Sequence, residues 1–293
     1  MMTKELSHKS TLRELKTDRG VLRYHEAGEG PPLLLLHGSG PGVTGWRNFR
    51  GNLPVLAEHF RCLVLEFPGF GVSDPVEGGH PMALAQDAAV RFLDGLGLDR
   101  VRVIGNSMGG IVATQLAVAH PERVERLVTI GGVGRSLFGP APAEGINLLM
   151  EFTEDPTREK LVAWLHSMVY DPALVTEELV EERWEQATEP ATLASARRMY
   201  GRAAFAAQAA AAAKADATPL WAQLHKVQAP TLVTWGRDDR VSPVDMAVLP
   251  MRTLPRGELH VFPDCGHWVM IEQKEAFESA VLSFLNRPVE GGR

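Results

Sequence analysis

The chain has only two cysteines among its 293 residues, Cys62 and Cys265. Two cysteines form neither a disulfide framework nor a set of metal ligands, so we predict two buried apolar side chains and no metal site. The sequence also lacks an apolar signal core at its N-terminus, and none of its apolar runs approaches the length of a membrane span. We therefore expect a soluble, cytoplasmic protein without a membrane partner.

Charge of one sign does not gather in any part of the sequence. The 30 basic and 36 acidic residues give a formal net charge of -6 without a basic cluster. This distribution argues against nucleic acid or an anionic membrane surface as a partner, whereas small neutral or acidic ligands remain open. Because 45% of the residues are hydrophobic, the chain can bury one large core, and we predict one domain with an insertion.

Short, almost wholly apolar runs recur along the chain, and we predict that they are strands of an α/β fold. They lie at residues 33–36, 62–65, 101–104, 127–130 and 231–235. A strand without a polar face must be covered on both sides, and intervening helices at 46–58 and 82–96 predict a mostly parallel central sheet flanked by helices. We also expect an early antiparallel strand at 21–27, a last strand at 258–262 and a last helix at 274–285.

The strand signals stop between about residues 134 and 224, where helical patterns take over. Helices are predicted at 143–152, 156–170, 176–187 and 191–216. We predict that residues 136–225 form an inserted helical cap, or lid, and that residues 1–135 and 226–293 form the two parts of the core. The alanine-rich stretch 203–217 favours helix by propensity but has few side chains to anchor it, which indicates a solvated, slightly frayed helix rather than a mobile lid.

The segment Gly105-Asn106-Ser107-Met108-Gly109 fits the G-x-S-x-G pattern of a nucleophile elbow. It follows the predicted strand 101–104 and precedes a helix at 108–119 that Pro121 ends. In such an elbow the serine has a strained backbone, and the two glycines leave room where strand and helix cross. We predict that Ser107 is a nucleophile; the alternative is a serine in an ordinary tight turn.

A serine nucleophile needs a base to take its proton and an acid to orient that base. Asp239 follows the predicted strand 231–235, and His267 follows the last strand, so serine, acid and histidine occur in the order of the α/β-hydrolase fold. Asp238 is the rival acid. We predict that Ser107, Asp239 and His267 form a catalytic triad.

Acyl chemistry also needs hydrogen-bond donors for the negative charge on the carbonyl oxygen. We predict that the backbone N–H groups of Met108 and Ser39 form this oxyanion hole. Ser39 lies in the glycine-rich loop 37–42, which follows the strand 33–36. The loop lacks the lysine of a phosphate-binding P-loop, and His37 is expected to stabilise its turn.

Beyond the fold, the sequence resembles the meta-cleavage product hydrolases, which hydrolyse carbon–carbon bonds in aromatic and steroid catabolism. The stretches that carry the resemblance span nearly the whole chain: 37–42 with Trp46 and Asn48, 105–110, 138–146, 235–240 and 265–268. The resemblance implies a substrate like 2-hydroxy-6-oxo-hexa-2,4-dienoate, no metal or organic cofactor, and a homodimer or higher homo-oligomer.

The resemblance also implies which residues bind the substrate. Arg183 in the cap matches an arginine that holds the carboxylate end, Trp268 and Asn48 match residues that line that side, and Asn106 matches a polar neighbour of the nucleophile. The resemblance likewise implies that Gly38 and Gly40 lie against the substrate. Plainer alternatives are open: a surface ion pair for Arg183, a turn for Asn48 and core packing for Trp268.

Two departures from the family pattern are visible. Glu66 stands where an aspartate is common in the wider fold, with no evident catalytic consequence. The stretch 203–217 matches the family pattern poorly. The group accepted on the 6-oxo carbon therefore remains open. The alternative functions are a carboxylesterase or lactonase on the same scaffold, and a non-catalytic small-molecule binder.

Overall fold

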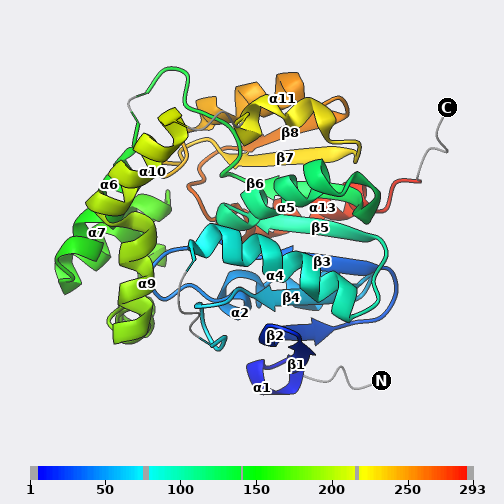
Figure 1. Cartoon of the computed structure of the whole chain (residues 1–293), viewed down its shortest axis with the longest axis horizontal. Helices are drawn as coiled ribbons and strands as arrows, with labels where there is room; N and C mark the ends of the chain where they lie inside the picture. The colour runs from blue at the N-terminus through cyan, green and yellow to red at the C-terminus, as the bar shows by residue number, and fades with distance from the viewer. Residues whose placement is uncertain (1–5, 75–78, 140, 215–217, 289–293) are drawn as a thin grey trace.

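The computed structural model describes residues 6–74, 79–139, 141–214 and 218–288, and these form one eight-stranded sheet (Figure 1). Its order is β1-β2-β4-β3-β5-β6-β7-β8, and pairing is antiparallel for β1, β2 and β4 and parallel from β4 to β8. The strands are β1 (Leu12–Thr17), β2 (Gly20–Ala27), β3 (Pro32–Leu36), β4 (Arg61–Glu66), β5 (Val101–Asn106), β6 (Val124–Ile130), β7 (Thr231–Gly236) and β8 (Gly257–Phe262). The prediction of a mostly parallel α/β sheet is confirmed.

Helices cover both faces of the sheet, which is why its central strands are apolar on both sides. Successive leucines of β3 alternate between two apolar cores: Leu33 and Leu35 face one, and Leu34 and Leu36 face the other. The first core is covered by α2 (Gly45–Phe49), α3 (Leu53–Leu56), α12 (Val269–Glu272) and α13 (Lys274–Leu285), and the second by α4 (Pro81–Gly95), α5 (Met108–Ala119) and the region of α11 (Val248–Thr253). Across the described ranges, no helix is long and apolar enough to cross a membrane.

One sequence prediction near the N-terminus needs correction, and two elements there had no prediction. The single helix expected at 46–58 is two short helices, because Pro54 cannot donate a helical hydrogen bond and is accommodated in the first turn of α3. The edge strand β1 and the one-turn helix α1 (His8–Thr11) were not expected. In β1 no residue is fully buried, so its sequence carries little apolar periodicity.

Five helices gather beyond one end of the sheet, at the left of Figure 1. They are α6 (Glu144–Glu154), α7 (Arg158–Met168), α8 (Glu177–Ala187), α9 (Pro190–Tyr200) and α10 (Arg202–Lys214). The helix predicted at 191–216 is in fact two, because Gly201 adopts an extended conformation between α9 and α10, and residues 215 and 216 lie outside the described part. The helix predicted from residue 156 begins at Arg158, where the Thr157 side chain caps it. The boundaries of the cap remain a prediction.

Candidate active site

Ser107 lies between β5 and α5 in a backbone conformation that few side-chain-bearing residues adopt. Its φ of 51° and ψ of -114° put it in a strained region, where a residue costs about 1–3 kcal/mol unless its surroundings hold it. A hydrogen bond from its N–H to Ile130 O, at 2.8 Å, holds it here. A Cβ on Gly109 would lie 2.0 Å from Leu36 O, and one on Gly105 would lie 2.3 Å from Gly109 O, so both positions accept only glycine.

Asp239 and His267 meet on the loops that follow β7 and β8. The distance from His267 Nδ1 to Asp239 Oδ2 is 2.7 Å, and both side chains are buried. The other carboxylate oxygen accepts the N–H groups of Val241 and Ser242, each at 2.8 Å, which fixes the rotation of the carboxylate. Because an aspartate only accepts hydrogen bonds, Nδ1 carries the proton and Nε2 is left as the basic nitrogen.

The rival carboxylate faces elsewhere. Asp238 forms an ion pair with Arg237 at 3.2 Å, on the exposed side of the same loop. Of the two adjacent aspartates, only Asp239 contacts His267.

Gly131 and Gly132, directly after β6, bring the serine and the histidine to one place. A Cβ on Gly131 would lie 3.4 Å from His267 Cε1, and a Cβ on Gly132 would lie 2.7 Å from Ser107 Cα. The cap contributes as well, because the His267 N–H donates to Met168 O at the end of α7, at 2.8 Å. The imidazole and the carboxylate are thus in contact at the carboxyl edge of the parallel strands, beside the cap, and Gly131 and Gly132 place Ser107 in the same region. Among the described residues, the Ser107 hydroxyl forms no hydrogen bond with His267.

The loop after β3 packs against the nucleophile. A Cβ on Gly38 would lie 3.5 Å from Ser107 Cβ, and the Gly38 N–H donates to Asn48 Oδ1 at 2.9 Å. The same oxygen accepts Asn106 Nδ2 at 3.2 Å, whereas Asn106 Oδ1 is buried without a partner among the residues described. Met108 is the first residue of α5, so no helical carbonyl accepts its N–H, which is the condition for an oxyanion donor.

Cap residues hold this loop from the other side. The Ser39 hydroxyl forms a hydrogen bond with the hydroxyl of Tyr200 on α9, and burial raises the pKa of Tyr200 to about 12. Gly40 lies against α7, since a Cβ there would come within 2.9 Å of the Trp164 ring. The sequence carries no local signal for Tyr200, because its role depends on a contact between segments 161 residues apart.

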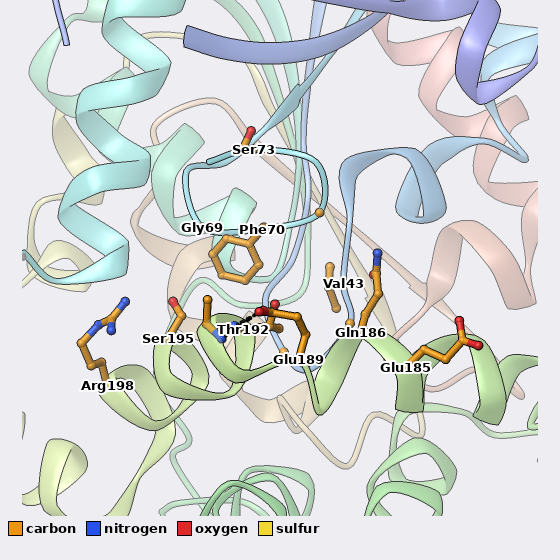
Figure 2. Close-up of a pocket in the computed structure, with 14 residues that line it drawn as sticks. Val43, Gly69, Phe70, Ser73, Glu185, Gln186, Glu189, Thr192, Ser195 and Arg198 are labelled. Carbon is orange, nitrogen blue, oxygen red and sulfur yellow. Dashed lines mark hydrogen bonds between the residues drawn. The ribbon is translucent and has the colours of Figure 1, made fainter. Parts of the chain in front are cut away.

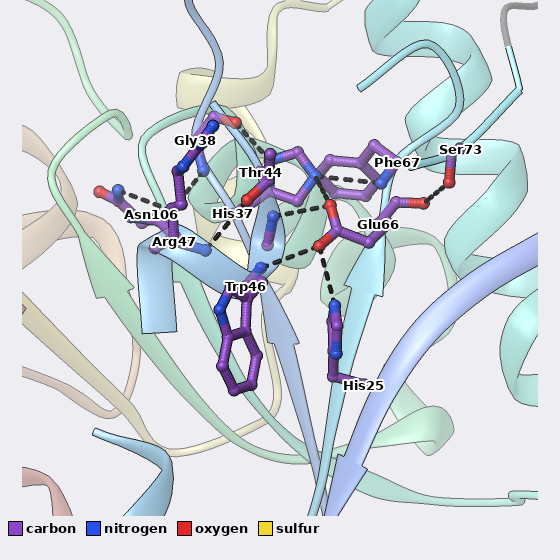
Figure 3. A network of polar contacts seen from close by, with 12 residues as sticks. His25, His37, Gly38, Thr44, Trp46, Arg47, Glu66, Phe67, Ser73 and Asn106 are labelled. Atoms are coloured by element: carbon purple, nitrogen blue, oxygen red, sulfur yellow. Dashed lines mark hydrogen bonds and ion pairs between the residues drawn. The ribbon is translucent and has the colours of Figure 1, made fainter. Parts of the chain in front are cut away.

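Glu66, for which the sequence indicates no catalytic consequence, lies at the centre of a buried polar network (Figure 3). Its carboxylate accepts the N–H groups of Gly45 and Trp46, at 2.7 and 2.8 Å, and His25 Nε2 lies 3.4 Å away. Burial acts to raise the pKa of Glu66, but His25 and the two N–H groups outweigh it and hold the pKa below its ordinary value of 4.5. These N–H groups begin α2, the helix that carries Asn48.

His37 stabilises the loop, as expected. The distance from its Nδ1 to Gly38 O is 2.6 Å, and its Nε2 accepts the Phe67 N–H at 3.0 Å. Burial lowers the pKa of His37 below its usual value, which keeps the ring neutral.

Arg183 of α8 is a buried cation without an anionic partner in the described structure. Only 6% of the residue is exposed, its guanidinium lies 5.5 Å from the centre of the Trp268 ring, and its one hydrogen bond, to Pro41 O, is 3.4 Å long. Its Nε has no partner among the described residues. Burial, together with the charges of Arg47 and Arg50, lowers the pKa of Arg183 to about 9. The alternative of a surface ion pair is therefore wrong.

A buried unpaired guanidinium is costly, and an incoming carboxylate is the natural group to relieve that cost. The neighbouring Glu182 does not supply one, because it forms an ion pair with Arg47 at 3.2 Å. Across the described residues, no group of three His, Cys, Asp or Glu side chains gathers as metal ligands.

Comparisons with known proteins agree with this geometry. A family model described as alpha/beta hydrolase fold matches residues 31–274. A 2-hydroxy-6-oxo-6-phenylhexa-2,4-dienoate hydrolase from Burkholderia cepacia is 36% identical over 279 residues, which cover 94% of each chain. The chain belongs to the meta-cleavage product hydrolases of the α/β-hydrolase fold. The resemblance found in the sequence is confirmed.

Other relatives of this hydrolase differ in the substrate that they are named for. A 2-hydroxy-6-oxononadienedioate/2-hydroxy-6-oxononatrienedioate hydrolase from Burkholderia vietnamiensis is 39% identical and covers 91% of each chain. Among solved structures, a meta-cleavage product hydrolase from Pseudomonas fluorescens IP01 superposes with a TM-score of 0.84 at 30% identity, covering 95% of this chain and 99% of that chain.

Proposed function

We propose that this hydrolase cleaves a carbon–carbon bond in 2-hydroxy-6-oxo-dienoate products of aromatic or steroid ring cleavage, giving a 2-hydroxy-dienoate and a carboxylic acid. The observation that carries the proposal is the buried guanidinium of Arg183, which has no anionic partner in the described residues and lies against Trp268. A simple ester has no carboxylate to place there, whereas every dienoate of this class has one.

The substrate carboxylate binds Arg183, and its dienol end lies against Trp268 and Asn48. Carbon is a poor leaving group, so the dienol first becomes its keto tautomer, in which the electrons of the breaking bond can be delocalised. Binding energy at the carboxylate holds the 6-oxo carbon near the nucleophile.

Ser107 Oγ then attacks the 6-oxo carbon while His267 Nε2 takes its proton, and Asp239 stabilises the imidazolium that forms. The N–H groups of Met108 and Ser39 donate to the oxyanion. Cleavage releases the dienolate, which takes a proton to become the 2-hydroxy-dienoate. Water, activated by His267, hydrolyses the acyl-serine to the carboxylic acid. The reaction needs no cofactor.

The decisive experiment uses the coloured dienoate itself. Mixing the enzyme with ring-cleavage products of a catechol and of a biphenyl diol should bleach their visible absorbance with one equivalent of acid formed. Ser107→Ala should bind the dienoate without forming product. Persistent colour with folded enzyme and every dienoate in the panel would contradict the proposal, and faster turnover of a simple aryl ester would favour the esterase alternative.

The cytoplasmic location and the homo-oligomeric state remain predictions of this proposal. Gel filtration with light scattering tests the second, and a monomer would contradict it.

A further inference from the structure

A cavity of about 290 Å³ opens beside Arg183, where α2, α8 and α12 come together. Its wall includes Arg47, Asn48, Arg50, Arg183, Trp268 and Lys274. Asn48 lies between this cavity and the reaction centre, because it lines the cavity and its Oδ1 accepts the N–H of Gly38, which packs on Ser107. The cavity therefore reaches the carboxylate end of the proposed substrate site.

The charge of this cavity is strongly one-sided. Four cationic side chains line it, against the single carboxylate of Glu182. Arg47 is paired with that carboxylate, and Lys274 is paired with Glu278 at 2.9 Å. Arg50 is exposed, and its side chain has no hydrogen bond or ion pair to any residue in the described ranges. Two guanidinium groups, Arg50 outside and Arg183 inside, thus remain without an anionic partner in that part of the chain.

A second cavity, of about 350 Å³, has the opposite character (Figure 2). It lies between the loops after β3 and β4 and the helices α8 and α9, and it includes Gly40 of the loop beside the nucleophile. Its charged wall residues are Glu185, Glu189 and Arg198, so carboxylates outnumber cations. From these charges we expect the carboxylate of a dienoate to be disfavoured here and favoured at the first cavity.

We propose that the cavity lined by Arg50 and Arg183 is the port through which the carboxylate end of an anionic substrate reaches Arg183, and that Arg50 steers it. This inference rests on the proposed function. A cleft lined by charge of one sign concentrates the field and raises the local concentration of a counter-charged ligand. Arg50 acts on the rate of association, because it lies at the exposed end of the port and leaves the bound carboxylate to Arg183.

The test measures association of a coloured dienoate with the Ser107→Ala protein by stopped-flow absorbance. Added to this background, Arg50→Glu should lower the association rate constant about threefold at low ionic strength, and the difference should vanish near about 0.5 M salt, because screening removes the interaction of exposed charges. Arg198→Glu makes the same charge change at the other cavity and is the matched control. It should leave the rate constant within experimental error.

Slower association of Arg198→Glu but not of Arg50→Glu would overturn the inference, and so would equal rates for both variants and the parent at low salt. Both results leave the proposed function intact if the wild type bleaches the dienoate.

Failure of the proposed function is recognised separately, by a wild type that neither binds nor converts any dienoate. Iodide then tests the port without a substrate. The fluorescence of Trp268 is obtained as the difference between each protein and the same protein with Trp268→Phe. Iodide should quench this fluorescence less in Arg50→Glu than in wild type. Neutral acrylamide should quench it equally in both proteins. Equal iodide quenching in the two proteins would overturn the inference.

Discussion

Replacing Arg183 by methionine should make the unliganded protein more stable and at the same time nearly inactive on dienoates. The guanidinium is buried, lacks an anionic partner in the described structure and has a pKa lowered to about 9. At pH 7 it is still protonated, because that pH lies well below the lowered value, so the cost of burying the charge is present in full. Methionine has similar length and no charge, and it can pack on Trp268.

The size of the gain follows from two opposing contributions. Lowering the pKa from 12.5 to about 9 corresponds to about 5 kcal/mol at 1.36 kcal/mol per unit, an upper limit for the cost of the charge. Replacing buried charges by apolar side chains gains about 1–4 kcal/mol in other proteins, and losing the contact with the Trp268 ring costs about 1 kcal/mol. A net gain of about 2 kcal/mol should raise the Tm by about 4 °C.

The effect on catalysis has the opposite sign. Removing one partner of a buried, hydrogen-bonded charge pair costs about 3 kcal/mol, so kcat/KM for a dienoate should fall about 150-fold. Hydrolysis of an aryl ester, which makes no use of Arg183, should change less than about threefold.

Thermal unfolding at pH 7 without ligand, and absorbance assays with both substrates, measure these effects. Arg252→Met, at an exposed position of α11, is the control and should alter neither quantity. A fall in Tm for Arg183→Met beyond that of the control would refute the reasoning about the unpaired charge. Unchanged dienoate kinetics would refute the role assigned to the guanidinium.

Three further predictions concern the rest of the site. Asp239→Asn should reduce kcat for the dienoate about 10⁴-fold, measured by absorbance, because the histidine loses the acceptor that sets its tautomer; a fall below tenfold would contradict this role. Gly105→Ala should unfold several degrees lower in a thermal melt, since the new Cβ would lie 2.3 Å from a backbone oxygen, whereas Gly51→Ala, with no atom closer than 4.0 Å, should not. Glu66→Gln should lower the Tm at pH 7. The folded-state pKa of Glu66 is depressed below 4.5, so its stabilisation is present above that pH and lost as the pH falls through the folded value. The deficit of Glu66→Gln should therefore shrink in melts as the pH is lowered below 4.5, and a deficit that grows in acid would contradict the assignment.

The local elements at the centre of the fold could be predicted because their signals lie within a few residues. A strand buried on both faces must be apolar throughout, so β3, β4 and β7 are visible as runs of apolar residues. The turn that holds Ser107 is equally visible, since its G-x-S-x-G pattern spans only residues 105–109, although the backbone atom that requires glycine at 109 belongs to the distant strand β3. The predictions failed where a local pattern was interrupted, at Pro54 and at Gly201, because periodicity records the favoured face of a helix and not where the chain changes direction.

The sequence by itself determined the fold class, the family and the order of serine, acid and histidine, because each follows from short motifs and their succession along the chain. The tertiary structure showed that Asp239, which the sequence favoured over Asp238, faces the histidine, and it alone decided that Glu66 anchors the helix carrying Asn48. It likewise decided that Arg183 is buried without an anionic partner in the described residues, although its helix is rich in glutamates. These three outcomes depend on which segments, distant in sequence, pack against one another. Burial and charge pairing are properties of this packing and not of any one segment.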